Sequence, residues 1–326
     1  MPEGATAWPG AGDCQAAGAR EGACAPPRGA RTPKKSHSVL FRSKGEVFAF
    51  IDTQREHFSV ISLCRRYGVT TAGFYAWRRR GESARAEQDR TLLTEIRRLF
   101  LAHEERYGSP RLYRLLVRAG WRVSRRRVAR LMRVAGLRAR AVRGYRAKVK
   151  VHRLYARHPN RLWKVHVHRP NQVWVGDITY LRVGGSWRYL AIVMDQYSRR
   201  ILAWTLTRRR TAAVTCAVLA RAARRRATRG VIFHSDRGSE YMGAPFCTLL
   251  ARLGILQSAN VRGPGDNAHA ESFFHSLKAE LTRGVCFHTD RVLRKQLARY
   301  IRYYNTIRLH SSLDYLSPLA FERSAA

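Results

Sequence analysis

Three carboxylates lie in local settings that an isolated acid seldom occupies. Asp177 is inside the apolar run 173–180, Asp236 follows the apolar run 231–235, and Glu271 is early in a segment with helical periodicity. Each acid alone is also explained as a turn acid, a cap or a solvated helix residue. Oxygen donors are what hard divalent cations bind, and phosphoryl-transfer sites hold two such ions together. Taken jointly, the three acids predict a site for two Mg²⁺ ions, with Mn²⁺ as the alternative metal.

Glu271 requires a helix to position it. Residues 268–281 have one apolar stripe at the 3.6-residue period, formed by Ala270, Phe273, Phe274, Leu277 and Leu281. A polar stripe is predicted on the opposite face, formed by Asn267, Glu271, His275 and Lys278. Lys278 lies two turns beyond Glu271, so we expect its ammonium to contact a DNA phosphate. The alternative is an ordinary surface lysine.

The two aspartates require a sheet. Strands are predicted over residues 173–183, 187–195, 200–206, 231–235 and 255–258, with helices over 211–227 and 245–253. Gly184-Gly185 predicts a hairpin turn between the first two strands. Three antiparallel strands followed by alternating helix and strand predict an α/β sheet covered by helices. Asp177 and Asp236 would then be neighbours if the first and fourth strands pair.

Other acids near these motifs are given structural roles. Asp195 is a rival acid, but the following Gln196-Tyr197-Ser198 favours a role in holding a tight turn. Glu240 and Asp266 are predicted to be loop acids. Asp266-Asn267 also lies where it could cap the helix of Glu271.

The motifs around the three carboxylates resemble a known family. They are residues 174–180 (WVGDITY), 234–239 (HSDRGS), 266–274 (DNAHAESFF) and the C-terminal stretch 303–313 (YYNTIRLHSSL) with Leu316-Ser317-Pro318. In this order they resemble the DDE transposase and retroviral integrase superfamily, and more narrowly the large-frame transposases of bacterial insertion sequences. One departure is the spacing, because 271 − 236 − 1 = 34 residues separate Asp236 from Glu271. The family usually has one more, and the loop 262–265 is where the deletion would fall.

The resemblance implies a ribonuclease-H-like integrase core preceded by an all-α helix-turn-helix region. It implies that Asp177, Asp236 and Glu271 are the catalytic and metal-binding residues of DNA strand cleavage and strand transfer at element ends. It also implies a homo-oligomer on DNA, and an active form fused to a small upstream-frame protein by ribosomal frameshifting. The alternative to a transposase is a catalytically inactive DNA-binding regulator or decayed copy. A ribonuclease of the same fold is disfavoured by the helix-turn-helix outlines.

The charge of the chain points to a polyanionic partner. The 326 residues have a formal net charge of +40 and a pI near 11.4. No Asp or Glu occurs from residue 106 to residue 176, while Lys and Arg recur throughout. A continuous basic surface or linker of this kind predicts binding to a polyanion. The resemblance implies that this partner is double-stranded DNA, namely the terminal inverted repeats of an element and its target.

Several functional classes are disfavoured. The six cysteines contain no Cys-x-x-Cys pair, and His152, His158, His166 and His168 have no paired cysteines with which to bind zinc. No apolar run approaches the ~20 residues of a membrane span, and the N-terminus lacks a signal-peptide core. We therefore expect no membrane partner and a cytoplasmic, nucleoid-associated protein.

The chain is predicted to have four regions: a disordered leader (1–45), a helical DNA-binding region (46–140), a basic linker (141–170) and the catalytic core with C-terminal helices (171–326). In the linker, Tyr145, Tyr155 and Trp163 are predicted either to pack on the core or to stack on an unpaired DNA end.

Two helix-turn-helix outlines occur in the DNA-binding region. The first, at residues 57–80, has Val60, Ile61 and Cys64 as a short apolar stripe and Thr70 or Thr71 as a cap; a plain helical hairpin is the alternative. In the second, Ser124 caps a helix with Val128, Leu131 and Met132 inward. Its other faces carry the predicted DNA-binding residues Arg125, Arg126, Arg127, Arg130 and Arg133.

Overall fold

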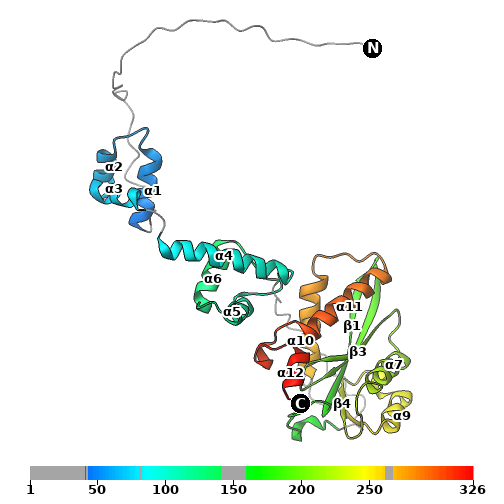
Figure 1. Ribbon diagram of the computed structural model, residues 1–326. Helices are drawn as coiled ribbons and strands as arrows, with labels where there is room; N and C mark the ends of the chain where they lie inside the picture. Colours follow the sequence, from blue (N-terminus) through cyan, green and yellow to red (C-terminus); the bar gives the residue numbers. More distant parts are fainter. Residues whose placement is uncertain (1–40, 42, 81–82, 141–158, 261–266, 326) are drawn as a thin grey trace, which may run out of the picture. The chain divides into compact units, whose positions relative to one another are not determined.

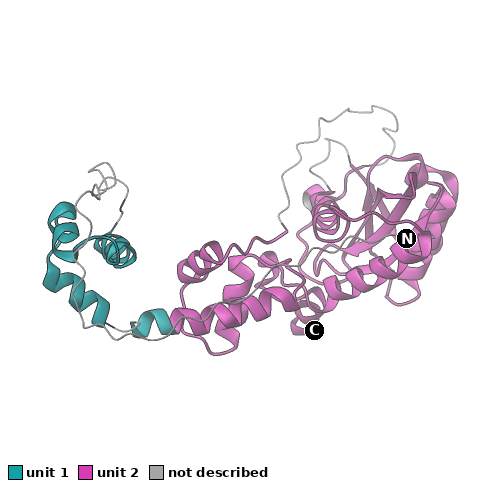
Figure 2. Ribbon diagram, turned by 90° about the horizontal axis from the view of Figure 1, so that it is seen from above, with its two compact units in different colours: residues 1–87 teal, residues 88–326 magenta. Residues whose placement is uncertain are grey.

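The computed structural model describes residues 41, 43–80, 83–140, 159–260 and 267–325. The chain forms two compact units, residues 1–87 and 88–326 (Figure 2). Most of the leader, the linker residues 141–158 with Tyr145 and Tyr155, and the loop 261–266 lie outside the described residues. The four-region division of the sequence stays a prediction.

The described part of unit 1 is a three-helix cluster of α1 (Lys44–Gln54), α2 (Val60–Tyr67) and α3 (Thr71–Arg79). Gly68 ends α2 with a φ of 69°, which favours glycine, and the Thr70 side chain accepts a hydrogen bond from the Gly73 N–H to cap α3. The core consists of Ile51, Leu63, Cys64 and Phe74. The prediction for Ile61 was wrong, because it is 65% exposed and Leu63 occupies the inward position.

The second helical cluster consists of α4 (Ala84–Ala102), α5 (Ser109–Arg118) and α6 (Arg125–Val134). Ser124 caps α6 by accepting a hydrogen bond from the Arg127 N–H, as predicted. The predicted inward residues of α6 are all buried. The cluster core is formed by Leu92, Ile96, Phe100, Tyr107, Leu112, Leu116, Val128, Leu131 and Met132, together with Leu309 from the C-terminal part of the chain.

A five-stranded sheet follows, in the order β3-β2-β1-β4-β5. The strands are β1 (Val173–Val183), β2 (Ser186–Asp195), β3 (Ile201–Thr207), β4 (Ile232–Ser235) and β5 (Leu256–Ala259). The β1-β2 and β2-β3 pairs are antiparallel, and the β1-β4 and β4-β5 pairs are parallel. Gly184 and Gly185 form the hairpin turn with φ of 49° and 81°. The predicted strands are therefore confirmed, with ends shifted by about one residue.

Helices cover both faces of the sheet (Figure 1). On one face, α10 (Ala268–Leu277) and α11 (Asp290–Thr306) pack on alternate strand residues such as Val175 and Leu190. On the other, α7 (Ala212–Ala223) and α9 (Ala244–Arg252) pack on Trp174 and Phe233. Because successive side chains of a strand point to opposite faces, the continuous apolar run in β1 serves both cores.

Some elements differ from the sequence expectation. A short helix, α8 (Ser239–Met242), occupies the predicted loop after Asp236. The helix of Glu271 ends at Leu277 and continues as a π-helix over Lys278–Thr282. The remaining elements are α12 (Pro318–Ser324) and the 3-10 turns Leu162–Lys164 and Ser311–Leu313.

The last part of the predicted linker packs on the core. Leu162, Val165 and Val167 contact the core beneath α10 and α11, and the Arg161 N–H donates to Ser258 Oγ at 2.9 Å. Trp163 is 57% exposed. None of the described helices is long and apolar enough to cross a membrane.

Candidate functional site

Asp177 lies on β1 just beyond the end of its pairing with β4. The parallel register joins Trp174 to Phe233 and Val175 to His234. Gly176 separates this paired part from Asp177, and a Cβ atom there would be 2.4 Å from Cζ of the buried Phe233 ring. Glycine is therefore required for β1 to approach β4 closely, and this approach brings Asp177 beside the chain that leaves β4 at Asp236.

The carboxyl group of Asp177 is electrostatically coupled to the other acids. Burial and the negative charge of Asp236 raise its pKa to about 8, and the charges of Glu271 and Glu240 act in the same direction. The hydrogen bond from the Ile178 N–H to Oδ1, at 2.8 Å, opposes the rise in pKa. Burial and the neighbouring acids therefore favour the uncharged form of Asp177, as expected where carboxyl groups gather at a partly buried position of the sheet.

Asp236 and Glu271 come from the two elements that flank Asp177. Asp236 directly follows β4, is exposed, and accepts a hydrogen bond from the Gly238 N–H through Oδ1 at 3.1 Å. Glu271 is in the first turn of α10 and is partly buried, and burial raises its pKa against the charge of His275. Both acids therefore stand near the end of the β1-β4 pair.

The side chain of Asn267 connects the start of α10 to β1 through a hydrogen bond. Its Nδ2 donates to the backbone oxygen of Gly176 at 3.2 Å, next to Asp177. The sequence expectation was wrong here, because Asn267 is 5% exposed and does not share an exposed stripe with Glu271. The residue precedes the helix, where the helical period no longer applies. Its neighbour Asp266, the other proposed cap, lies outside the described residues.

The charges of Asp236 and Glu271 act on Asp177, but the three predicted site acids do not form a compact ligand cluster. Within the ranges that the structure describes, no three His, Cys, Asp or Glu side chains stand together in a way that could hold a metal ion. The predicted metal-ligand roles of Asp177, Asp236 and Glu271 therefore stay predictions.

Two neighbours of Asp177 were missed as site residues. Glu240 was predicted to be a loop acid, but it is in α8, is 4% exposed, and lies 3.4 Å from the Arg210 guanidinium. Tyr241 is 2% exposed, and burial together with the charges of Asp177 and Asp236 raises its pKa well above the usual value. A four-residue helix gives no periodicity, so the sequence carries no signal that these side chains turn inward.

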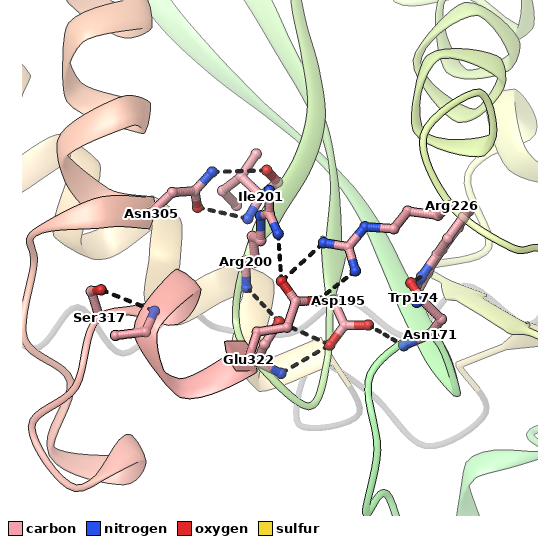
Figure 3. Close-up of polar contacts among 11 residues, drawn as sticks. Asn171, Trp174, Asp195, Arg200, Ile201, Arg226, Asn305, Ser317 and Glu322 are labelled. Carbon is pink, nitrogen blue, oxygen red and sulfur yellow. Dashed lines mark hydrogen bonds and ion pairs between the residues drawn. The ribbon is translucent and has the colours of Figure 1, made fainter. Parts of the chain in front are cut away.

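The rival acid Asp195 has the structural role that was predicted. Its Oδ1 accepts hydrogen bonds from the Ser198 N–H at 2.9 Å and from the Ser198 hydroxyl at 3.1 Å. Its Oδ2 accepts one from the Asn171 N–H at 2.7 Å (Figure 3). Burial raises the pKa of Asp195 against these bonds. The carboxylate therefore holds the turn after β2.

Lys278 stands at the end of α10, close to the predicted site. Its Nζ lies 4.8 Å from the centre of the Tyr180 ring. Burial lowers the pKa of Lys278, while the charge of Asp177 opposes this effect. The ammonium is therefore within electrostatic reach of Asp177. The predicted contact of Lys278 with a DNA phosphate stays a prediction.

The arginines of α6 divide into two groups. Arg127 and Arg130 both bind the carboxylate of Asp89 on α4, with an Arg127 Nε to Oδ1 distance of 2.7 Å. Arg125, Arg126 and Arg133 are exposed. The first two guanidinium groups therefore hold α6 against α4, and the exposed three are directed to solvent.

The chain is similar to known proteins over most of its length. Residues 167–263 and 271–325 match family models described as integrase core domain, and residues 87–145 match one described as HTH-like domain. The transposase InsF for insertion sequence IS3A of Escherichia coli strain K12 is 36% identical over 281 residues, which is 84% of this chain and 98% of that protein.

A second relative is the transposase for insertion sequence element IS904 of Lactococcus lactis strain IL1403. It is 34% identical over 248 residues, covering 74% of this chain and 97% of that protein. Among solved structures, the HTLV-2 integrase catalytic core domain in complex with magnesium is 14% identical, with a TM-score of 0.37 over 47% of this chain and 97% of that one. The two transposases are thus matched over nearly their whole length.

Proposed function

The chain belongs to the transposases of IS3-type insertion sequences, and we propose from this membership how its own residues cleave and join DNA. The predicted fold class is confirmed, since the family has a ribonuclease-H-like integrase core with an HTH-like domain before it. The predicted transposase function is confirmed by the same relatives, and the inactive regulator is not favoured. Membership makes the chain an enzyme of the polynucleotidyl transferase class.

We infer that Asp177, Asp236 and Glu271 are the catalytic residues. The observation that carries this is the electrostatic coupling at the end of the β1-β4 pair, where burial and the charges of Asp236 and Glu271 together raise the pKa of Asp177. Carboxyl oxygens are the ligands that hard divalent cations prefer, and a bound cation would relieve the repulsion that raises the pKa of Asp177. Two bound Mg²⁺ or Mn²⁺ ions would activate a water or a DNA 3′-hydroxyl and stabilise the leaving oxygen.

The chain's own groups orient the acids and the DNA. The N–H groups of Ile178 and Gly238 each bind one carboxylate oxygen, of Asp177 and Asp236 respectively, and so limit the rotation of these side chains. We assign to the Lys278 ammonium the neutralisation of a DNA phosphate near Asp177, a role supported by its electrostatic interaction with that acid. No covalent protein intermediate is needed for such in-line attack.

We propose that the DNA partners are the terminal inverted repeats of an element and the target DNA. We assign its contacts on α6 to the exposed Arg125, Arg126 and Arg133, while Arg127 and Arg130 set the position of the helix through Asp89. We further propose that the chain assembles as a homo-oligomer on these ends and that an upstream-frame fusion adds DNA specificity. Light scattering of the chain with and without a terminal-repeat duplex tests the assembly.

Metal-dependent nicking of a terminal-repeat duplex tests the catalytic assignment. We expect Asp177→Asn, Asp236→Asn and Glu271→Gln each to reduce cleavage to the level seen with a chelator. DNA binding should persist or tighten, because repulsion between carboxylate and phosphate is removed. Cleavage retained by any of these three variants refutes the assignment of that residue.

Asp314→Asn is the matched control, since it removes one negative charge from an exposed position. Asp314 has a φ of 49°, a conformation that asparagine also adopts, so this variant should cleave as the wild type does. A wild-type chain that binds the duplex without nicking it would instead indicate the regulator. Preferential cleavage of an RNA–DNA hybrid would indicate a ribonuclease.

A further inference from the structure

Two large aromatic side chains lie exposed near Asp177. Tyr180 on β1 is 56% exposed and Trp187 on β2 is 51% exposed. Their ring centres are 5.1 Å apart, and the rings are nearly perpendicular at 86°. Tyr180 lies three residues beyond Asp177 on β1, so the two side chains leave opposite faces of the strand. Lys278 is near both, because its Nζ lies 4.8 Å from the centre of the Tyr180 ring and its pKa responds to the charge of Asp177. The aromatic pair therefore forms a small apolar surface close to the candidate site.

This surface is not part of either sheet core. Leu181 and Val183, which alternate with Tyr180 along β1, are buried beneath α10 and α11, so Tyr180 points to the other face. β4 pairs with β1 only from Val173 to Val175, so the β1-β2 hairpin continues beyond that pairing. The Gly184 N–H at its tip donates to the Phe287 oxygen at 2.9 Å. The rings therefore stand on an anchored hairpin rather than on a free loop.

A basic side chain lies over each aromatic ring. Lys278 Nζ lies 4.8 Å from the Tyr180 ring centre, and Arg182 Cζ lies 5.8 Å from that of Trp187. Neither cation forms an ion pair with an acid in the part of the chain that the structure describes. Aromatic faces next to unpaired cations match a nucleotide, which presents a flat base beside a phosphate. A protein segment that bound this surface instead would need one acidic side chain opposite Lys278 and another opposite Arg182.

The base must be unpaired. Within a duplex the flat faces of the bases are covered by their neighbours, so a protein ring can stack only on a base at an end or outside the helix. We propose that Tyr180 and Trp187 form a stacking subsite for an unpaired nucleotide adjacent to the phosphodiester that is cut. This inference rests on the proposed cleavage at Asp177. It adds that the β1-β2 hairpin binds the unpaired base next to the cleaved phosphodiester.

Binding without metal tests the subsite separately from catalysis. The probes are a terminal-repeat duplex with an unpaired nucleotide at the cleaved end, the same duplex with an abasic residue there, and a fully paired duplex that is longer on that side. We expect Tyr180→Ala and Trp187→Ala each to weaken binding of the first probe by about 5- to 150-fold, the range for loss of one stacked base. Their affinity for the other two probes should equal that of the wild type.

The abasic probe supplies a second readout. The wild type should lose the same factor on going to abasic DNA, and the alanine variants should lose nothing further. Trp187→Phe should retain most of the wild-type affinity. Lys278→Ala should lower the salt dependence of binding by about one ion, whereas the aromatic variants should leave it unchanged.

Leu256→Ala is the control for loss of an exposed apolar side chain, because Leu256 is 46% exposed on β5, an edge strand that β4 separates from β1. The subsite is rejected if the aromatic variants bind the unpaired probe as tightly as the wild type, or weaken binding to all three probes equally. Wild-type nicking in Mg²⁺ is measured in parallel. Its absence rejects the proposed catalytic function, while normal nicking with unchanged variant binding rejects the subsite alone.

Discussion

The buried ion pair between Glu280 and Arg308 is expected to be a main determinant of the stability of unit 2. The side chains are 3% and 5% exposed, with an Arg308 Nη2 to Glu280 Oε1 distance of 2.7 Å and an Nε to Oε2 distance of 3.1 Å. The Tyr300 hydroxyl donates to Oε2 at 3.0 Å, and Arg308 Nη2 also donates to Ser276 Oγ. Burial opposes the charged form of Arg308, but the Glu280 carboxylate outweighs it and raises the pKa of Arg308.

Glu280→Gln removes the charge with little change in shape. It leaves Arg308 as a buried cation without an anion, and breaking a buried pair in this way costs about 3–5 kcal/mol. The glutamine oxygen can still accept one of the hydrogen bonds, so we expect the low end, about 3 kcal/mol. For a unit of this size each kcal/mol shifts the melting temperature by about 2–4 °C, which predicts a fall of about 6–12 °C.

The double variant Glu280→Gln/Arg308→Met distinguishes lost pairing from lost packing. Removal of both charges should recover about 2 kcal/mol or more relative to the sum of the single variants. Calorimetry and urea unfolding of the full chain measure these values. Glu95→Gln is the control, since its pair with the 65% exposed Arg98 should contribute less than about 1 kcal/mol. A cost below about 1 kcal/mol for Glu280→Gln, or additive single and double variants, would refute the reasoning.

Two further predictions concern the sheet. Gly176→Ala should destabilise the chain by about 1–3 kcal/mol, because the new Cβ would lie 2.4 Å from a buried Phe233 ring that Phe246 backs at a ring-centre distance of 5.2 Å. Gly108→Ala, whose Cβ would meet nothing closer than 3.7 Å, should lose only the preference for glycine over alanine at the N-cap of α5, about 0.5–1 kcal/mol, in the same thermal melts. A loss as large as that of Gly176→Ala would contradict this account. Burial alone would raise the pKa of Glu322, but hydrogen bonds from Arg226 and Arg200 hold it below its usual value (Figure 3). This contribution to stability is present above the unfolded pKa of about 4.3 and is lost as pH falls through the folded value, so urea midpoints of Glu322→Gln should approach those of the wild type in acid; a gap independent of pH would contradict it.

Local pattern was sufficient for most of the architecture. The alternating and continuous apolar runs predicted the strand of Asp177 from Val173 to Val183, and the structure has the same bounds. The helical stripe predicted that Phe273 and Leu277 would be buried and that Glu271 would not. Such predictions succeed because each depends on the period of one element, which a few neighbouring residues determine.

The family resemblance identified the candidate catalytic acids, which the hydrophobic periodicity alone could not do. Nothing in the periodicity distinguishes Asp177 from the turn acid Asp195, since both occur in apolar strand sequences. The turn sequence that follows Asp195 and the motifs around Asp177, Asp236 and Glu271 made that distinction, and the parallel register of β1 with β4 is consistent with it. The departure in spacing falls at residues 262–265, outside the described residues.

What the sequence determined by itself is the set of elements, the burial of their apolar faces, the basic charge and the family. Tertiary structure decided which polar groups meet: Glu240 turns inward beside Asp177, Asn267 binds the Gly176 carbonyl, and Glu280 pairs with Arg308. The hydrogen bond between Glu280 and Arg308 joins residues 28 positions apart, and the one between Asn267 and Gly176 joins residues 91 positions apart. No local period encodes such a pairing, because it depends on how strands register and how helices end once the whole sheet is assembled.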